Sequence, residues 1–377
     1  MVPGRATHRA SEARALLENL QVTRARDVKD RHVLGQQGVE RWLDTFLARH
    51  DEAALNRLRD EARTIQNELG WEKEFTKLDG LIGALLGTRN VRLKHPNARA
   101  RAKGLPVDDE RVDLFQKVAE YLNAHPPLIP PAPARPDPAL AAFIESYFSN
   151  YIEGTEFELG EAYEIVMSGQ PAPAREDDSH DVIGTFDAIL ASMRNPQVPA
   201  THEAFEAQLK AWNAQVLSAR PGKEPGQWKT RNNRAGNTVF VEPALVRGTL
   251  AKGFELILLA PLPQVQAALA KFIVAEVHPF SDGNGRTARL LMNHILSAAN
   301  LTRIIIPTVF REDYTLSLKA LSNGGHAQPY ERMLNKAATF SAGLDYGSQE
   351  HLFRQLEKSQ ALKEPHEGKL DLRALAA

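Results

Sequence analysis

HPFSDGNGRTAR, residues 278–289, gathers a histidine, a carboxylate, two glycines and two arginines into one short segment. Two of its glycines flank an asparagine, and the residues that follow, 286–296, have the apolar spacing of a helix. Successive N–H groups of such a turn point into one concavity, and the positive end of the helix dipole adds to it. The segment therefore predicts a backbone cradle for phosphate, formed by Gly283, Asn284 and Gly285.

Four polar side chains of the same stretch suit phosphate binding and proton transfer. Arg286 and Arg289 are three positions apart, so they share a helix face and can both reach phosphate oxygens. Asp282 is a hard oxygen ligand, suited to one position on a Mg²⁺ that phosphates also coordinate. His278 ends the preceding helix, and a reference pKa of about 6.5 allows it to accept a proton at neutral pH. Each residue alone has an ordinary structural explanation, so the chemical interpretation depends on their combined spacing.

The composition indicates a soluble chain with a substantial core. Of 377 residues, 43% are hydrophobic and 25% charged, and the formal net charge is −1. Such a balance provides no global attraction to nucleic acid or to acidic membranes. The absence of cysteine excludes disulfides and thiol chemistry. The N-terminus lacks the apolar segment of a signal peptide, and no apolar run reaches the roughly 20 residues of a membrane span. We therefore expect a cytoplasmic protein without a membrane or nucleic-acid partner.

Helical spacing dominates the chain and is interrupted by prolines and by one hairpin signal. Residues 1–122 are predicted to be helical, and the prolines of 123–138 predict an extended connector. In residues 227–241, turn residues precede the β-branched Thr238 and Val239, which is typical of a β-hairpin. The expected fold is therefore all-α with one β-hairpin. Further helices are predicted at 137–157, 161–169, 180–195, 201–217, 245–260 and 262–277, with a helical tail at 346–377.

HPFSDGNGRTAR resembles the signature HxFx(D/E)GNGRxxR of the Fic-domain family and matches it at every defined position. The resemblance extends through the helices, the hairpin and DYTLSLKALSNGGHAQPYERML at 313–334, and we assign the domain to residues 139–345. It implies an all-α domain whose hairpin is called the flap. It also implies an enzyme that moves AMP from ATP to a hydroxyl of a protein.

The resemblance also implies a role for each residue of the motif. His278 would deprotonate a Ser, Thr or Tyr hydroxyl of the target protein, which would then attack the α-phosphate of ATP. Asp282 would hold Mg²⁺, and the arginines would stabilise the triphosphate and the pyrophosphate leaving group. The phosphates would be bound by Gly283, Asn284, Gly285, Arg286 and Arg289.

Residues outside the motif are assigned by the same resemblance. The flap residues Thr238, Val239 and Phe240 would hold an extended segment of the target by strand addition. Tyr314 and Asn323 lie where relatives contact the nucleotide. Packing in the core is an equally good interpretation of Tyr314, and a turn before Gly324 is an equally good one of Asn323.

A second family pattern lies upstream of the hairpin. Ser149-Asn-Tyr-Ile-Glu153-Gly154 matches (S/T)xxxE(G/N), the inhibitory helix of self-restrained Fic proteins, expected here near 139–154. A glutamate presented to Arg289 would take the ion pair that the γ-phosphate of ATP needs, and ATP would then bind in an unproductive pose. The resemblance thus implies autoinhibition by Glu153.

Other functions are compatible with the same residues. In the reverse reaction, Glu153 would position a water that removes AMP from a modified protein. Other donors, namely UTP, CDP-choline or the γ-phosphate of ATP, would change the group transferred, although Arg289 favours a nucleoside triphosphate. An inactive regulatory or binding module is the non-enzymatic alternative, and the intact His278 argues against it. Residues 1–122 match no motif, so target docking, homo-oligomerisation and scaffold packing all stay open for them, and the sequence does not identify the target protein.

Overall fold

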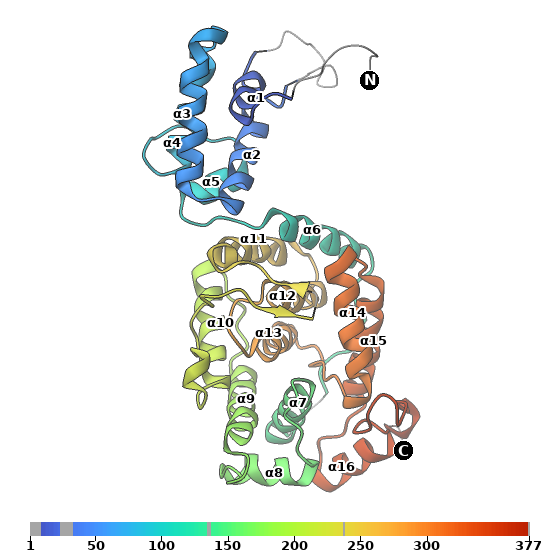
Figure 1. Cartoon of the computed structure of the whole chain (residues 1–377). Coiled ribbons are helices and arrows are strands. Elements are labelled where there is room, and N and C mark those ends of the chain that lie inside the picture. Colours follow the sequence, from blue (N-terminus) through green and yellow to red (C-terminus); the bar gives the residue numbers. More distant parts are fainter. Residues whose placement is uncertain (1–8, 23–32, 134–136, 237, 376–377) are drawn as a thin grey trace. The chain divides into compact units, whose positions relative to one another are not determined.

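The computed structural model describes residues 9–22, 33–133, 137–236 and 238–375. Within this part of the chain, helices predominate and the named strands, β1 (Arg234–Ala235) and β2 (Thr238–Val239), form one antiparallel hairpin (Figure 1). The predicted fold class, all-α with one β-hairpin, is therefore confirmed. The chain divides into a first compact unit that ends at Asp109 and includes 247–249, and a second unit of 110–246 and 250–377.

The first unit is a small helical domain with its own core. Leu17, Leu43, Leu55 and Leu81 are fully buried in it. Its longest helix, α3, begins after Asp51, whose side chain accepts the N–H of Ala54 as an N-cap. The helices of this unit are α1 (Glu12–Asn19), α2 (Gly35–Arg49), α3 (Glu52–Leu69), α4 (Glu72–Leu85) and α5 (Pro96–Ala102).

The sequence predicted an N-terminal region that ends at residue 122, but the boundary between the two units lies at Asp109. The helix α6 (Asp109–Ala124) buries Phe115, Val118 and Leu122 in the core of the second unit, and Phe115 meets Phe272 edge-on with ring centroids 5.8 Å apart. The proline-rich segment that follows lies inside this unit, where Pro131 forms an antiparallel bridge with Leu301. The described residues 126–133 form no helix, as the prolines predicted, but they belong to the second unit and do not connect the two units.

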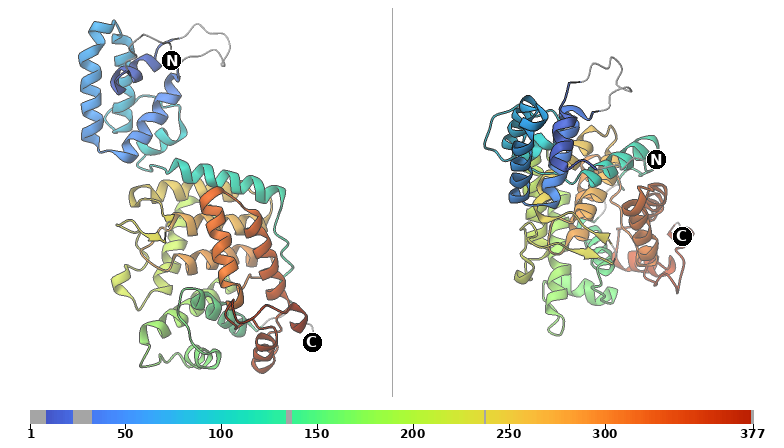
Figure 2. Two further views of the ribbon diagram at one scale, coloured as in Figure 1. Left: turned by 45° about the vertical axis from the view of Figure 1, so that its right-hand side comes forward. Right: turned by 45° about the horizontal axis from the view of Figure 1, so that its top comes forward.

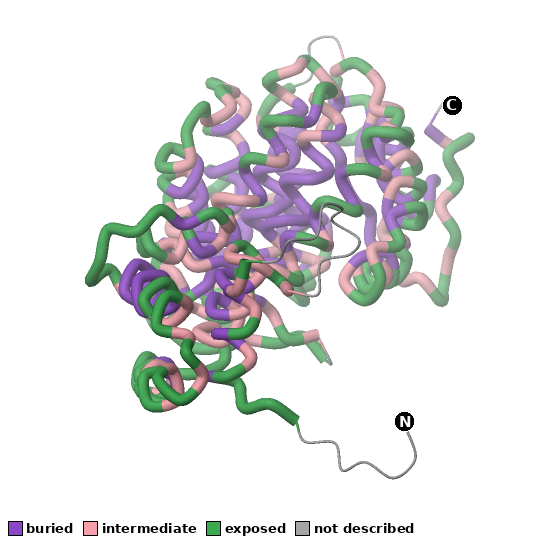
Figure 3. Tube along the Cα trace, turned by 90° about the horizontal axis from the view of Figure 1, so that it is seen from above, coloured by how far each residue is buried: buried purple, intermediate pink, exposed green. Residues whose placement is uncertain are grey.

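The second unit is built around two central helices, α12 (Pro263–Val277) and α13 (Asn284–Ala298), which are almost entirely buried. The helices α9 and α10 lie on one side of this pair and α14 and α15 on the other (Figures 1 and 2). Figure 3 shows buried stretches running through the interior of this larger unit. Its other α-helices are α7 (Pro138–Ile152), α8 (Leu159–Ser168), α9 (Glu176–Arg194), α10 (His202–Val216), α11 (Val246–Leu259), α14 (Arg311–Gly324), α15 (Gln328–Ala342) and α16 (Gln349–Lys358).

Capping side chains explain where two of these helices begin. The carboxylate of Asp137 accepts the N–H groups of Ala139 and Leu140, and Pro138 occupies the first turn of α7, as the sequence predicted. Thr201 caps α10. The predicted tail at 346–377 contains α16 and a short 3₁₀ helix. The described residues of this unit also form the 3₁₀ helices η2 (Pro221–Lys223), η3 (Pro243–Leu245), η4 (Thr308–Phe310) and η5 (Leu372–Leu375).

Candidate active site

The motif at 278–289 forms the junction between α12 and α13. His278 follows the last residue of α12 with a φ of 51°, a left-handed conformation that a non-glycine residue rarely adopts. Gly283 precedes α13 with a φ of 71°, and a Cβ there would lie 3.0 Å from Nδ2 of Asn213. The N–H groups in the first turn of α13 have no acceptor within the helix, so this end of α13 is suited to bind an anion.

Asn284 contributes loop geometry and not a side-chain ligand. Its Nδ2 donates to the carbonyl of Phe280 at 2.9 Å, and its Oδ1 accepts the N–H of Phe280 at 2.8 Å. Phe280 is fully buried and stacks on Trp228 with ring centroids 5.0 Å apart. The side chain of Asn284 therefore closes the loop onto the core, which leaves its backbone N–H for the predicted cradle.

Arg289 is buried and surrounded by groups from α7 and α14. Its Nε donates to Oγ of Ser149 at 3.0 Å and its Nη2 to the carbonyl of Ser149 at 2.8 Å. Nη2 also donates to Oε1 of Glu153 at 2.7 Å, and Nη1 donates to the hydroxyl of Tyr314 at 3.3 Å. The structure thus brings together Ser149, Glu153 and Arg289 as the inhibitory pattern implied. Gly154, with a φ of 95°, turns the chain away after Glu153.

Two features favour this position of Glu153: the neighbouring arginine cations, and the space left by the missing side chain of Gly285. Burial alone would raise the pKa of Glu153, but the cations of Arg289 and Arg286 lower it below its ordinary value. A Cβ on Gly285 would lie only 2.2 Å from Oε1 of Glu153, so the carboxylate fills the space left by the missing side chain. Glu153 is therefore ionised at neutral pH and occupies volume directly above the first turn of α13.

His278 is held beneath the flap. The ring of Phe240 stacks on its imidazole, with centroids 3.8 Å apart and planes 5° from parallel. Nδ1 lies 3.2 Å from the carbonyl of Ala275, and a proton placed there leaves Nε2 as the acceptor. Burial, with a smaller contribution from the cation of Lys229, lowers the pKa of His278 to about 4 against the opposing effect of the Ala275 carbonyl. The imidazole is therefore neutral at pH 7 and able to accept a proton.

A cavity of about 280 Å³ connects these groups. Its lining comes from the hairpin, the end of α7, α12, the start of α13 and α14. The residues that line it are Ile152, Glu153, Ala235, Thr238, Phe240, Phe272, Ala275, Glu276, His278, Gly285, Arg289, Tyr314, Thr315, Leu318, Lys319 and Ser322.

Asn323 and Val239, which were predicted to contact the nucleotide and the target protein, do not line this cavity, and neither do Gly283, Asn284 and Arg286 of the predicted phosphate site. Asn323 is exposed, and its neighbour Ser322 lines the cavity instead, because Ser322 shares the helix face of Thr315 and Leu318. Val239 is 56% exposed, and its carbonyl accepts a hydrogen bond from Nη2 of Arg111 at 2.7 Å. Tyr314 is buried in the core and also lines the cavity, so packing in the core and contact with a nucleotide are compatible for this residue.

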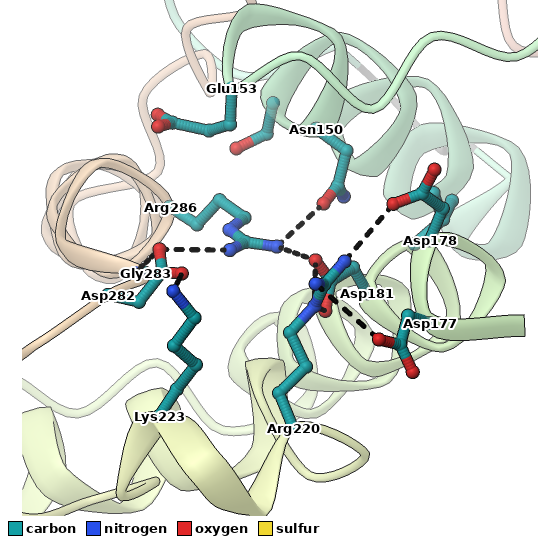
Figure 4. A network of polar contacts seen from close by, with 12 residues as sticks. Asn150, Glu153, Asp177, Asp178, Asp181, Arg220, Lys223, Asp282, Gly283 and Arg286 are labelled. Atoms are coloured by element: carbon teal, nitrogen blue, oxygen red, sulfur yellow. Dashed lines mark hydrogen bonds and ion pairs between the residues drawn. The ribbon is translucent and has the colours of Figure 1, made fainter. Parts of the chain in front are cut away.

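The two terminal nitrogens of Arg286 are engaged by protein groups, and Arg286 does not line the cavity. Its Nη1 lies 2.8 Å from Oδ2 of Asp181 and donates to Oδ1 of Asn150 at 3.2 Å, as Figure 4 shows. Arg220 pairs with the other oxygen of Asp181 at 2.9 Å. Nε of Arg286 is buried and has no hydrogen-bond partner among the described residues, so one N–H remains for an anion bound at the motif.

Asp282 has the properties of a single metal ligand. Its side chain is 36% exposed, and its Oδ2 lies 3.3 Å from Nζ of Lys223 (Figure 4). Burial alone would raise the pKa of Asp282, but the N–H of Gly283 and the cations of Arg286 and Lys223 lower it. No group of three His, Asp or Glu side chains that could hold a metal was found in the described ranges. Because Mg²⁺ commonly uses one carboxylate together with substrate phosphates, Asp282 fits that ion beside the cradle.

Sequence reasoning missed several polar residues of the site. Asp181 carries no local signal, since its partners Arg220 and Arg286 are distant in the chain. Lys229 donates to Asn233 at 2.7 Å, and burial lowers its pKa to about 8. Glu276 could have been identified from the sequence, because it is a carboxylate in the largely apolar helix α12, two residues before His278.

Comparison with known proteins agrees with this site. Residues 203–296 match the model of the Fic/DOC family. The chain is 30% identical over 199 residues to "Protein adenylyltransferase fic-1" of Caenorhabditis briggsae, covering 52% of this chain and 39% of that protein. It is 27% identical over 246 residues to "Protein adenylyltransferase Fic" of Nematostella vectensis, covering 63% of this chain and 56% of that protein. The chain thus spans between about two fifths and just over half of the length of these relatives.

Solved structures also match. Fic-1 from Caenorhabditis elegans is 22% identical with a TM-score of 0.45, covering 76% of this chain and 93% of that chain. A Fic family protein from Desulfovibrio desulfuricans is 18% identical with a TM-score of 0.48, covering 72% of this chain and 84% of that chain. Among the described residues, no helix combines the length and the apolar character needed to cross a membrane.

Proposed function

We propose that this chain, which carries a domain of the Fic/DOC family, is a protein adenylyltransferase restrained by its own Glu153. It would move AMP from ATP to a hydroxyl group of another protein. One observation carries the proposal: a neutral His278, the first turn of α13 and the buried Arg289 meet in one cavity, and Glu153 occupies Arg289. The names of the relatives support the same activity.

His278 is the base in the proposed reaction. Nε2 accepts the proton of the target hydroxyl while the hydroxyl oxygen forms a bond to the α-phosphorus of ATP. The bond from that phosphorus to the bridging oxygen breaks, and pyrophosphate leaves. The N–H groups at the start of α13, the orphan Nε of Arg286 and the guanidinium of Arg289 are placed to stabilise the negative charge. Mg²⁺, held by Asp282, would neutralise the phosphates when bound.

Glu153 blocks the productive pose of ATP in this proposal. A γ-phosphate reaches Arg289 only if it replaces the carboxylate that now lies 2.7 Å from Nη2. Two charge-assisted ligands cannot share the same face of one guanidinium. Autoinhibition therefore follows from competition for Arg289, and binding of a target or displacement of the end of α7 would relieve it.

The protein substrate would be recognised at the flap. Thr238 and Phe240 line the cavity beside His278, so a segment paired with the hairpin would place its hydroxyl near Nε2. The carbonyl of Val239 is already engaged by Arg111, which limits the backbone groups that are available to such a segment. A cytoplasmic location and a homo-oligomeric state stay predictions.

The proposal is tested with a Glu153→Gly variant incubated in cell lysate with ATP labelled at the α-phosphate. We expect labelled proteins, and loss of the label when His278→Ala is added. Label transferred from γ-labelled ATP would indicate phosphoryl transfer instead. Release of AMP from a pre-modified protein by the parent chain, and its loss in Glu153→Gly, would indicate the reverse reaction. Labelling that persists without His278 would exclude the proposed base.

A further inference from the structure

The cavity extends well beyond the phosphate end described above. Tyr314, at the start of α14, accepts a hydrogen bond from Arg289, and Ser322 lies eight residues further along the same helix. Eight residues of α-helix span about 12 Å. Ser322 lines the same cavity as His278 and Arg289, so a nucleotide whose phosphates lie at Arg289 has room for its base at the Ser322 end, and the residues there are candidates for base recognition.

Ser322 is hydrogen-bonded to a buried carboxylate at this end. Its Oγ donates to Oε2 of Glu276 at 2.5 Å, and both residues line the cavity. Glu276 is only 3% exposed. Oε1 of Glu276 lies 2.9 Å from Nη1 of Arg111 and forms an ion pair with it. Unlike Oε2, this Oε1 accepts no hydrogen bond from the residues that the structure describes.

The carboxylate of Glu276 determines which way the hydroxyl of Ser322 points. A carboxylate accepts hydrogen bonds and donates none, whereas a serine hydroxyl has one proton to donate. Since Ser322 donates that proton to Glu276, its oxygen offers only lone pairs to the cavity. The wall at Ser322 is therefore an acceptor, which attracts an amino group and repels a carbonyl oxygen.

The four common bases differ at this type of contact. Adenine carries an amino group at N6 and cytosine carries one at N4, while guanine has the acceptor O6 and the uracil-type base has the acceptor O4 at the equivalent edge. A base that leaves a buried acceptor without its donor binds roughly ten- to a hundredfold more weakly than one that satisfies it.

We propose that Ser322 is a specificity-determining residue, and Glu276 its positioning residue, so that the site prefers donor nucleotides with adenine or cytosine over those with uracil or guanine. This inference rests on the proposed function in requiring a nucleotide donor. It goes beyond that function in assigning the choice of base to a pair of residues outside the motif.

Binding experiments separate base choice from transfer. In the Glu153→Gly background, ATP, CTP, GTP and UTP are each titrated against a bound fluorescent ATP analogue at fixed Mg²⁺. We expect ATP and CTP to compete about tenfold or more better than GTP and UTP. Ser322→Ala should bring all four nucleotides to within about threefold of one another, because it removes the oriented acceptor.

Glu276→Gln tests the orientation itself. The glutamine amide can donate to Ser322, which frees the serine proton to point into the cavity, so the preference should shrink or reverse toward UTP and GTP. Ser317→Ala is the matched control, since Ser317 is buried on the same helix, bonds to the carbonyl of Tyr314 and does not line the cavity. It should leave the ratios unchanged, and thermal melts of each variant verify folding.

The binding and labelling results test the base preference and the transfer of AMP separately. Equal competition by UTP and ATP in Glu153→Gly itself, an unchanged ratio when Ser322→Ala is added, or no binding by any of the nucleotides would each overturn the inference. If the ratios behave as expected but no protein is labelled, the inference stands and the proposed transfer of AMP fails.

Discussion

Replacing Glu153 with glycine should release the enzyme, and the size of the release follows from one contact. The carboxylate accepts a charge-assisted hydrogen bond of 2.7 Å from Nη2 of Arg289, whose side chain is 5% exposed. Such bonds contribute about 1.5–3 kcal/mol. Because the side chain of Glu153 is 35% exposed, solvent screening reduces this to about 1–2 kcal/mol. We therefore expect about a 5- to 30-fold gain in productive ATP binding.

The assay is the initial rate of AMP incorporation at subsaturating ATP, with α-labelled ATP and the parent chain as reference. Glu153→Gln should recover part of the gain, because it removes the charge but keeps the volume. Glu156→Gly is the matched control: Glu156 lies three residues further along, is exposed and pairs with Arg311 at 3.2 Å. Equal rates for the parent and Glu153→Gly, or equal gains from both glycine variants, would refute the argument.

Three further variants test other parts of the site. Phe240→Ala should expose the imidazole of His278 and raise its pKa from about 4 toward about 6.5. Since only the neutral imidazole accepts a proton, kcat/KM of the Glu153→Gly enzyme should hold down to about pH 5, and adding Phe240→Ala should make it fall below about pH 6.5; a fall near pH 6.5 without that substitution would contradict the burial of His278. Asp181→Asn leaves the buried Arg286 without its carboxylate and should lower the free energy of unfolding by about 3–5 kcal/mol in denaturant titrations, whereas the exposed Asp177→Asn should change it by less than about 0.5 kcal/mol; equal effects would count against the buried pair. Gly283→Ala combines a φ of 71° with contacts of about 3 Å to Asn213 and Leu217, and should cost about 1–3 kcal/mol in the same titrations, so an unchanged midpoint would show that the turn tolerates a side chain.

Local features of the site could be predicted from the sequence because short-range geometry determines them. The glycines of the motif and the helical spacing after Arg286 predict a turn followed by a helix N-terminus, and α13 begins at Asn284. The hairpin was predicted from its turn residues for the same reason, and β1 and β2 lie within the predicted range. These features involve residues close together in the chain.

Features that depend on distant partners could not be predicted in this way. The spacing of Arg286 and Arg289 predicts a shared phosphate ligand, but it does not reveal that Nη1 of Arg286 pairs with Asp181, which lies in another helix. Asn323 was one position away from the residue that lines the cavity, since a shift of one residue turns a helical side chain by about 100°. The prolines of 123–138 predicted a break in the helices, and the described residues 126–133 form none, but prolines carry no information about which unit such a segment packs on.

The missing side chain at Gly285 makes autoinhibition by Glu153 depend on occupied volume as well as on ion pairing. The carboxylate of Glu153 lies in the space where a Cβ of residue 285 would be, directly above the N–H groups intended for phosphate. Ionic strength weakens attraction between exposed charges but does not change which atoms fit into a volume. Added salt should therefore slow the released and the restrained enzyme alike, and it should not convert one into the other.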